Sequence, residues 1–346
     1  MEIFPSPWPI PKVLRKTRRV LDNGAVAIRK GEIIAVGPQS EILGNYKGKK
    51  IDHGNTILLP GLINTHTHAP MSLFRGIADD LPLQQWLEKF IFPAEAKNLN
   101  PEFIRWGTRL ACLEMLKTGT TTFVDMYYFE DLIAEETKKA GMRGVLGQTV
   151  IQFPVADAKS PKESLAAAEK FFLRYQNDPL ITPAIAPHAL YTNKDEDLRA
   201  SRALANRYKL PLVIHLSETL KENRDILHAR NMSPTRTLDT LGVLDGWTIA
   251  AHSVYVDDTD LSVLKRRKTG VAHCPSSNMK LASGIAPILK MLDLKIPVGL
   301  GTDGPAGSNN DFNLFEEMDL ASKLAKVSSL NPEALSALKA VEMATI

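Results

Sequence analysis

Cysteine, long apolar runs and an excess of charge of either sign are all scarce in this chain of 346 residues. The two cysteines, Cys112 and Cys274, stand far apart in unlike contexts and offer no disulfide framework. No apolar run reaches the ~18 residues that a membrane-spanning helix needs, and the N-terminus lacks the pattern of a secretory signal. We therefore expect a cytoplasmic protein without a membrane partner.

The charge balance also bears on the partners of the protein. The 42 basic and 39 acidic residues leave a formal charge of +3, and basic residues form no long run, so a nucleic acid is not expected as a partner. A hydrophobic content of 44% is ordinary for a globular chain, and the length accommodates one barrel of ~250 residues with some chain left over. The sequence leaves open whether the protein forms a homo-oligomer.

The N-terminal part of the chain differs in pattern from the rest. Four prolines fall within residues 1–11, which we expect to be an irregular extension. Over residues 12–56, short β-type runs alternate with turn signals such as Asp22-Asn23-Gly24, which predicts a small β-sheet, part of a β-sandwich. This sheet looks incomplete, and the chain stops within a helical pattern near Met343. We therefore expect the C-terminus to be truncated.

Residues 57–346 alternate between apolar runs and helical patterns. The runs show little polar alternation, which is typical of parallel strands buried on both faces, and each leads to a helix. This pattern predicts an α/β fold, a (β/α)8 barrel of the TIM type. The eight predicted strands are residues 57–66, 120–126, 143–151, 181–188, 212–217, 248–253, 270–274 and 298–302.

The first predicted strand ends in His66 and His68. Residues two positions apart on a strand face the same side, so both imidazoles can point to one place. Alone, such a pair more often represents two histidines on an exposed strand face than a metal site.

The ends of later strands add to this pair. Active sites of such barrels collect at the carboxyl ends of the strands, and five of the eight predicted strands finish with a histidine or an aspartate. The later strand-end residues are His188, His215, His252 and Asp303. Three neutral imidazoles and one carboxylate suit a divalent first-row ion with one position left for water. We predict that His66, His68, His215 and Asp303 hold one such ion, with zinc expected first and iron second.

The open position suggests hydrolysis, because a bound divalent ion lowers the pKa of its water to ~7. Glu218, three residues after His215, is the candidate proton shuttle between this water and a substrate. His252 would orient the hydroxide or stabilise charge on the attacked centre, and Asp303 would accept a hydrogen bond from the nucleophile. The alternatives are core histidines at His252 and His188, a helix-cap or surface acid at Glu218, and a turn residue at Asp303.

Several motifs resemble a known family. The runs P-G-L-I-N-T-H-T-H, H-L-S-E-T and G-T-D-G, with the histidine of the sixth strand, resemble the metal-dependent amidohydrolase superfamily. Within it, M-S-L-F-R-G-I-A-D-D-L-P-L-Q-Q-W-L, G-T-T-T-F-V-D-M and H-C-P-S-S-N-M-K-L-A-S-G-I-A-P resemble the 5-methylthioadenosine/S-adenosylhomocysteine deaminases. The resemblance extends from about Gly24 to the last residue. It implies a distorted (β/α)8 barrel, a single zinc or iron ion, and hydrolytic loss of ammonia from an adenine ring.

The resemblance also implies roles for individual residues. The metal ligands of the family fall on His66, His68, His215 and Asp303. Its proton shuttle falls on Glu218, and its sixth-strand histidine falls on His252. Three further positions concern the nucleoside: Glu95 matches the acid that receives the ribose hydroxyls, His188 matches a histidine that contacts the nucleoside, and Trp86 resembles part of the apolar wall. A carboxylate can accept hydrogen bonds from two vicinal hydroxyls at once. The fourth strand lacks the lysine that bridges two metals in binuclear relatives, so one ion is expected.

The chain departs from the family in one respect. The segment from Ile151 to Glu163 offers only Lys159 and Lys162 where an arginine would hold the amino-acid carboxylate of S-adenosylhomocysteine, which favours methylthioadenosine or adenosine. The main alternative is a guanine, cytosine or triazine aminohydrolase or chlorohydrolase, whose substrate has no ribose for Glu95. A non-catalytic protein on the same barrel and a truncated, inactive product are the others.

Overall fold

The computed structural model describes residues 2–5, 10–12, 19–54 and 56–346, and it divides into two compact units. Met1–Gly61 together with Thr345–Ile346 make up one unit, and Leu62–Ala344 make up the other. Within the described ranges, no helix combines the length and the apolar character that crossing a membrane requires.

The smaller unit contains two sheets, which are antiparallel except that β1 and β6 pair in parallel. A four-stranded sheet has the order β5-β4-β1-β6, and a two-stranded sheet pairs β2 with β3. The strands are β1 (Glu2–Pro5), β2 (Ile10–Lys12), β3 (Arg19–Leu21), β4 (Gly24–Arg29), β5 (Glu32–Pro38) and β6 (Lys49–Lys50), and the helix is α1 (Gln39–Asn45). The predicted hairpin between β4 and β5 is present, and β1 pairs with β4 on its other side.

The expectation that residues 1–11 are irregular is wrong for β1 and β2. Pro5 is the last residue of β1, and Pro11 lies in a two-stranded sheet, where each strand is an edge. Proline is compatible with strand ends and edge strands because it removes no hydrogen bond that a central strand needs. Residues 6–9 lie outside the described residues.

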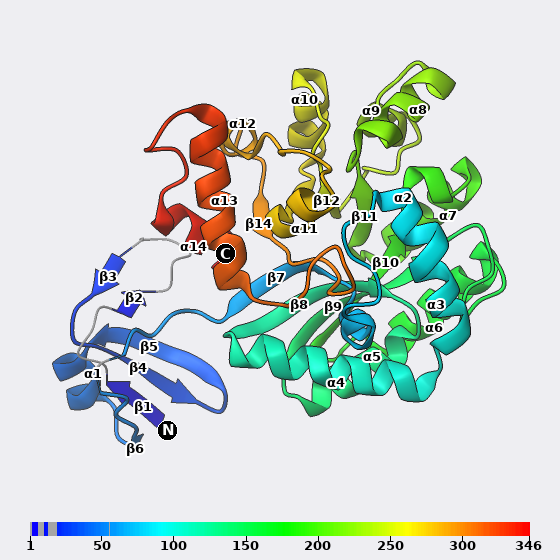
Figure 1. The fold of residues 1–346 in the computed structure, drawn as a ribbon. Coiled ribbons are helices and arrows are strands. Elements are labelled where there is room, and N and C mark those ends of the chain that lie inside the picture. The colour runs from blue at the N-terminus through cyan, green and yellow to red at the C-terminus, as the bar shows by residue number, and fades with distance from the viewer. Residues whose placement is uncertain (1, 6–9, 13–18, 55) are drawn as a thin grey trace. The chain divides into compact units, whose positions relative to one another are not determined.

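The larger unit is the predicted barrel. Its eight parallel strands follow one another in the sheet in chain order (Figure 1). They are β7 (Leu62–Thr67), β8 (Thr120–Tyr127), β9 (Arg143–Val150), β10 (Ile181–Pro187), β11 (Leu212–Leu216), β12 (Thr248–His252), β13 (Gly270–His273) and β14 (Val298–Leu300). The backbone N–H of Asp303 donates to His66 O over 3.0 Å, which brings the last strand end beside the first and nearly closes the ring. The first strand is shorter than predicted, because residues 57–61 belong to the smaller unit.

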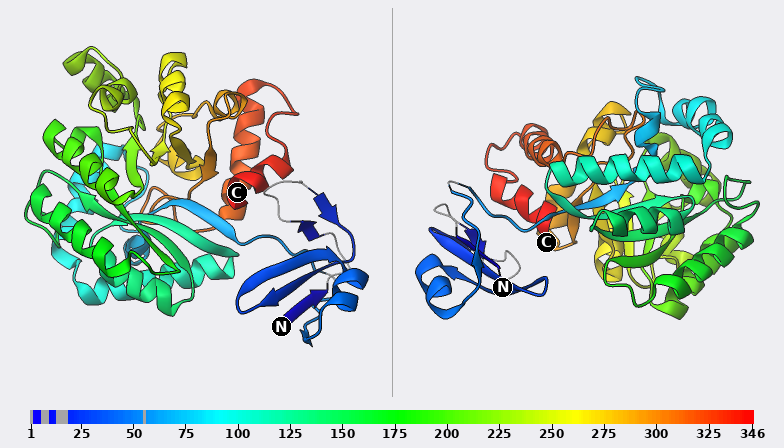
Figure 2. Two further views of the ribbon diagram at one scale, coloured as in Figure 1. Left: turned by 180° about the vertical axis from the view of Figure 1, so that it is seen from behind. Right: turned by 90° about the horizontal axis from the view of Figure 1, so that it is seen from below.

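Helices lie on the outside of the eight-stranded sheet (Figure 2). They are α4 (Pro101–Lys117), α5 (Glu130–Lys139), α6 (Pro161–Tyr175), α7 (Asp195–Tyr208), α8 (Leu220–Arg230), α9 (Pro234–Thr240), α10 (Asp258–Arg267), α11 (Pro275–Lys280), α12 (Ile288–Asp293), α13 (Leu314–Ser329) and α14 (Ala337–Thr345). Several begin at a side-chain cap. The Asn100 side chain, for example, accepts from the backbone N–H groups of Glu102 and Phe103 at the start of α4.

The connection from β7 to α4 carries most of the additional structure. It contains a 3₁₀ helix, η1 (Ala69–Phe74), followed by one continuous helical stretch. This stretch consists of α2 (Leu83–Trp86), a π-helical turn η2 (Leu87–Ile91) and α3 (Phe92–Asn98).

The period-two pattern of the strands positions the site. Val213 and Ala186 belong to the small cluster of buried residues that also contains Val124 and Met126 of β8. His215 and His188 follow Val213 and Ala186 by two residues, so their side chains leave the strands on the same face. The carboxyl ends of the strands therefore carry polar side chains above a layer of small apolar ones.

Candidate active site

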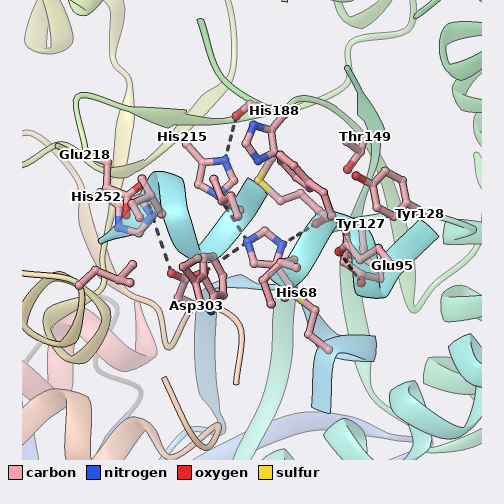
Figure 3. A pocket seen from close by; sticks show the side chains of 18 of the residues that line it. His68, Glu95, Tyr127, Tyr128, Thr149, His188, His215, Glu218, His252 and Asp303 are labelled. Carbon is pink, nitrogen blue, oxygen red and sulfur yellow. Dashed lines mark hydrogen bonds and ion pairs between the residues drawn. The ribbon is translucent and has the colours of Figure 1, made fainter. Parts of the chain in front are cut away.

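A pocket of about 560 Å³, including its open mouth, lies at the carboxyl ends of the strands. The residues singled out from the sequence that line it are His68, Trp86, Glu95, His188, His215, Glu218, His252 and Asp303. His66 is fully buried beside them. Figure 3 shows Glu218 and His252 at one end of the pocket, Glu95 and Tyr127 at the other, and His68 and Asp303 between.

Four side chains meet between these ends with separations that suit a metal ion. His66 Nε2 and His68 Nε2 lie 3.4 and 3.2 Å from Asp303 Oδ1. His215 Nε2 lies 3.4 Å from His68 Nε2. Tetrahedral ligands with bonds of about 2.0–2.1 Å stand about 3.3–3.4 Å from one another. These three separations therefore match those around a single tetrahedral ion.

His252 is a fifth member of this group. One ligand atom each from His66, His215, His252 and Asp303 lies within 4.8 Å of the others. However, His252 Nε2 is 4.0 Å from both Asp303 Oδ2 and Glu218 Oε2, which is longer than the separations above. The cluster can hold a metal ion, and His252 stands at its edge toward Glu218.

The imidazole rings are oriented toward the same point. His68 Nδ1 lies 2.7 Å from the carbonyl oxygen of Met126, and His215 Nδ1 lies 2.8 Å from that of His188. A carbonyl oxygen only accepts, so each Nδ1 carries the hydrogen and each Nε2 keeps its lone pair for a metal.

The surroundings of His66 and Asp303 also suit a bound metal ion. Neither ring nitrogen of His66 makes a hydrogen bond, and burial lowers its pKa to about 4, which keeps the ring neutral. Burial raises the pKa of Asp303, but the neighbouring His66 and His68 side chains outweigh this and hold the pKa well below its usual value. Asp303 Oδ2 also accepts from Ser277 Oγ over 2.7 Å. A buried imidazole without partners is costly, and a bound ion would supply the missing partner.

Glu218 is held over the pocket by a turn after β11. The backbone N–H groups of Ser217 and Glu218 donate to the carboxylate of Glu222 on α8, over 3.1 and 2.7 Å. Ser217 has a φ of 51°, in the left-handed region, which turns the chain sharply there. Burial raises the pKa of Glu218, which makes this carboxyl group a better proton acceptor than an exposed one.

Two supporting residues were missed by sequence reasoning. Glu222 follows Glu218 by four residues in H-L-S-E-T-L-K-E, and this spacing into a helix start could have indicated it. Asn278 Oδ1 lies 3.0 Å from His252 Nδ1, so that this nitrogen donates and Nε2 faces Glu218. Asn278 lies within the run H-C-P-S-S-N-M-K that resembles the family, but on a helix after β13, and the sequence indicated no role for it individually.

The other end of the pocket is built from the helix that precedes α4. Trp86 is buried and donates from Nε1 to the carbonyl oxygen of Ala306 over 2.9 Å. Glu95 is 7% exposed and accepts from the Tyr127 hydroxyl over 2.7 Å. Burial raises the pKa of Glu95 to about 7, although the hydrogen bond from Tyr127 lowers it.

The π-helical turn brings Trp86 and Glu95 to one pocket. They are nine residues apart, and nine residues of regular α-helix at 3.6 residues per turn would place them about 180° apart. A π-turn accommodates one extra residue, which reduces the angle to about 80°. The η2 turn lies between the two residues, and both line the pocket.

His188 lies beside the metal cluster. Its Nδ1 is 3.0 Å from Thr192 Oγ1, and burial lowers its pKa to about 3, so that it is neutral. Neither lysine nor arginine lines the pocket within the described part of the chain, whereas Glu95, Glu218 and Asp303 do. The charged side chains of the pocket other than histidine are therefore all acidic.

Known proteins resemble this chain over nearly its whole length. The model of the amidohydrolase family matches residues 57–346. A 5-methylthioadenosine/S-adenosylhomocysteine deaminase of Thermodesulfovibrio yellowstonii is 48% identical over 96% of this chain and 76% of its own length. A 5'-deoxyadenosine deaminase of Methanocaldococcus jannaschii is 43% identical over 94% of this chain and 79% of its own length.

A solved structure is also similar. The crystal structure of an adenosine deaminase from Xanthomonas campestris with bound zinc superposes with a TM-score of 0.92 at 36% identity. The similarity covers 99% of this chain and 78% of that one.

Proposed function

Because the chain belongs to the amidohydrolase family, we propose that it is a metal-dependent deaminase of adenine nucleosides. In this reaction water replaces the amino group of the adenine ring, and ammonia is released. The observation that carries the proposal is the composition of one pocket. A set of metal donors and a buried proton carrier lie at one end, and a buried carboxylate that can accept a diol lies at the other.

We propose that His66, His68, His215 and Asp303 hold one divalent ion, with zinc as the first candidate and iron as the second. The donor separations near 3.3 Å and the lone pairs on Nε2 of His68 and His215 support this set. Three imidazoles and one carboxylate suit zinc, and the similar adenosine deaminase structure contains it. When bound, such an ion acts as a Lewis acid that brings the pKa of a water molecule to about 7.

Protons would be moved by the chain's own side chains. Glu218 takes a proton from the attacking water and delivers it to the substrate, as its burial and raised pKa allow. His252 presents Nε2 to the same space and orients the attacking water by accepting a hydrogen bond from it, because Asn278 fixes the other ring nitrogen as the donor. Asp303 accepts a hydrogen bond from the nucleophile.

The nucleoside would be recognised at the opposite end. Glu95 accepts hydrogen bonds from the vicinal ribose hydroxyls, Trp86 forms an apolar wall, and His188 contacts the nucleoside. A substrate with a carboxylate on its 5' substituent would meet acidic side chains and, among the described residues, no lysine or arginine. We therefore propose methylthioadenosine, 5'-deoxyadenosine or adenosine as substrates rather than S-adenosylhomocysteine.

A guanine, cytosine or triazine hydrolase is the alternative within the family. Its substrate has no ribose, so the Glu95 carboxylate would be buried in the pocket without a substrate partner. This argument favours a nucleoside.

The test is to incubate the zinc-loaded protein with adenosine, methylthioadenosine, S-adenosylhomocysteine and guanine. Ammonia release and the ultraviolet change on loss of the amino group report turnover. We expect adenosine and methylthioadenosine to react, S-adenosylhomocysteine to react more slowly, and guanine not to react. Turnover of guanine alone would contradict the proposal.

Other expectations from the sequence stay predictions. They are a cytoplasmic location and the absence of a nucleic-acid or membrane partner, whereas a homo-oligomer and a truncated, inactive product stay open alternatives.

A further inference from the structure

Tyr127 stands at the carboxyl end of β8, at the end of the pocket where Glu95 lies (Figure 3). Its hydroxyl donates to Glu95 Oε1 over 2.7 Å, and both side chains are buried. Within the described residues, the Glu95 carboxylate has no second hydrogen-bond partner. The phenol is therefore the group that fixes this carboxylate.

The phenol is well suited to hold a carboxylate that comes from a different element. Tyr127 belongs to a central barrel strand, and its ring packs 5.0 Å from that of Tyr128. Glu95 belongs to the helix of the β7–α4 connection. A carboxylate has about four acceptor positions, of which the phenol occupies one and a diol needs two. Without the phenol, the buried carboxylate would lose its partner and its fixed orientation.

We infer that Tyr127 is a positioning residue for ribose recognition, which holds Glu95 so that the carboxylate accepts both vicinal hydroxyls. The inference rests on the proposed function, because it takes the substrate to be a nucleoside with an intact 2',3'-diol. It predicts that selectivity for the diol belongs to the Tyr127–Glu95 pair rather than to Glu95 alone.

The variant Tyr127→Phe removes the hydroxyl and keeps the ring. For each variant, kcat and KM are measured for adenosine and for 2',3'-dideoxyadenosine on the same zinc-loaded preparation. The ratio of the two kcat/KM values does not depend on how much of the protein is folded. We expect this ratio to fall about 10- to 100-fold in Tyr127→Phe, mainly through the KM for adenosine, with dideoxyadenosine almost unaffected.

Tyr175→Phe is the matched control, because Tyr175 is a buried tyrosine of α6 that does not line the pocket. It should leave the ratio unchanged. In a double-mutant cycle, Tyr127→Phe should add little to the loss already caused by Glu95→Gln.

Two outcomes overturn the role of Tyr127 while the deaminase assignment stands. One is an equal loss on both nucleosides, and the other is a fully additive loss in the double variant. A wild-type protein that releases ammonia from neither nucleoside contradicts the proposed function, and the inference falls with it.

Discussion

The two ends of the pocket are built on different parts of the barrel unit. The metal donors and Glu218 sit at the ends of parallel strands, where backbone bonds such as that from Asp303 N to His66 O fix them. Glu95 and Trp86 come from a single helical connection between β7 and α4. The residues proposed for chemistry are thus tied to the sheet, while Glu95 and Trp86, which are proposed to contact the substrate, lie on a segment that can vary without moving the metal donors.

The largest expected effect concerns only the end of the pocket where the metal donors and Glu218 lie. In Glu218→Gln, turnover of adenosine should fall by about 1,000-fold or more, because the amide cannot take up the proton. The metal content, measured by elemental analysis, should stay at the wild-type level, since Glu218 is not among the proposed ligands. Glu88→Gln, an exposed acid on η2, is the control and should keep full activity. Loss of metal in Glu218→Gln would show that its role is misassigned.

An intermediate effect concerns only the end of the pocket where Glu95 lies. Inserting one alanine after Lys89, an exposed residue of η2, adds a residue beyond the one that the π-turn accommodates and should rotate Glu95 by about 100° relative to Trp86, away from the pocket. The kcat/KM ratio of adenosine to 2',3'-dideoxyadenosine should then fall about 10- to 100-fold, with metal content unchanged. Lys89→Ala keeps the residue count and is the control. An insertion variant that retains the wild-type ratio would contradict the claim that the helical register at η2 sets the position of Glu95.

The smallest effect distinguishes the two ends by pH. Burial raises the pKa of Glu95 from 4.5 to about 7, so the carboxyl is protonated and loses acceptor capacity below that pH. The adenosine to dideoxyadenosine ratio should therefore fall by about tenfold between pH 8 and pH 6. Changes at the metal end affect both nucleosides and cancel in the ratio. In Glu95→Gln the ratio should be flat with pH, and the same slope in that variant would assign the titration to another group.

The same contrast explains what the sequence could predict. Strand ends follow from apolar runs of the right length, so the sequence predicts that His215, His252 and Asp303 converge, and the barrel that joins them is confirmed. Tyr127 also ends a strand, but it lies outside the pattern of histidines and acids that indicates a metal site. The strand at Glu2–Pro5 is not predicted from the sequence, because its partner, β4, lies far along the chain and because Pro5 and the prolines that follow it indicate an irregular chain.

Helical periodicity does not predict that Trp86 and Glu95 line the same pocket. A regular helix places Trp86 and Glu95 on opposite faces, and nothing in L-E-K-F-I marks a π-turn. These two residues were predicted only through resemblance to a family. Supporting contacts such as Glu222 beneath Glu218 depend on the turn at Ser217, whose left-handed φ is a property of the folded chain.

The most direct test of the account is the metal content of the purified chain together with its ammonia release from adenosine. We predict one divalent ion per chain, loss of ammonia release after chelation, and recovery when zinc is restored. Asp303→Ala should bind less metal and should not recover. Full activity after complete removal of metal, or two ions per active chain, would contradict the claim that four groups from the first, fifth and eighth strand ends hold a single ion.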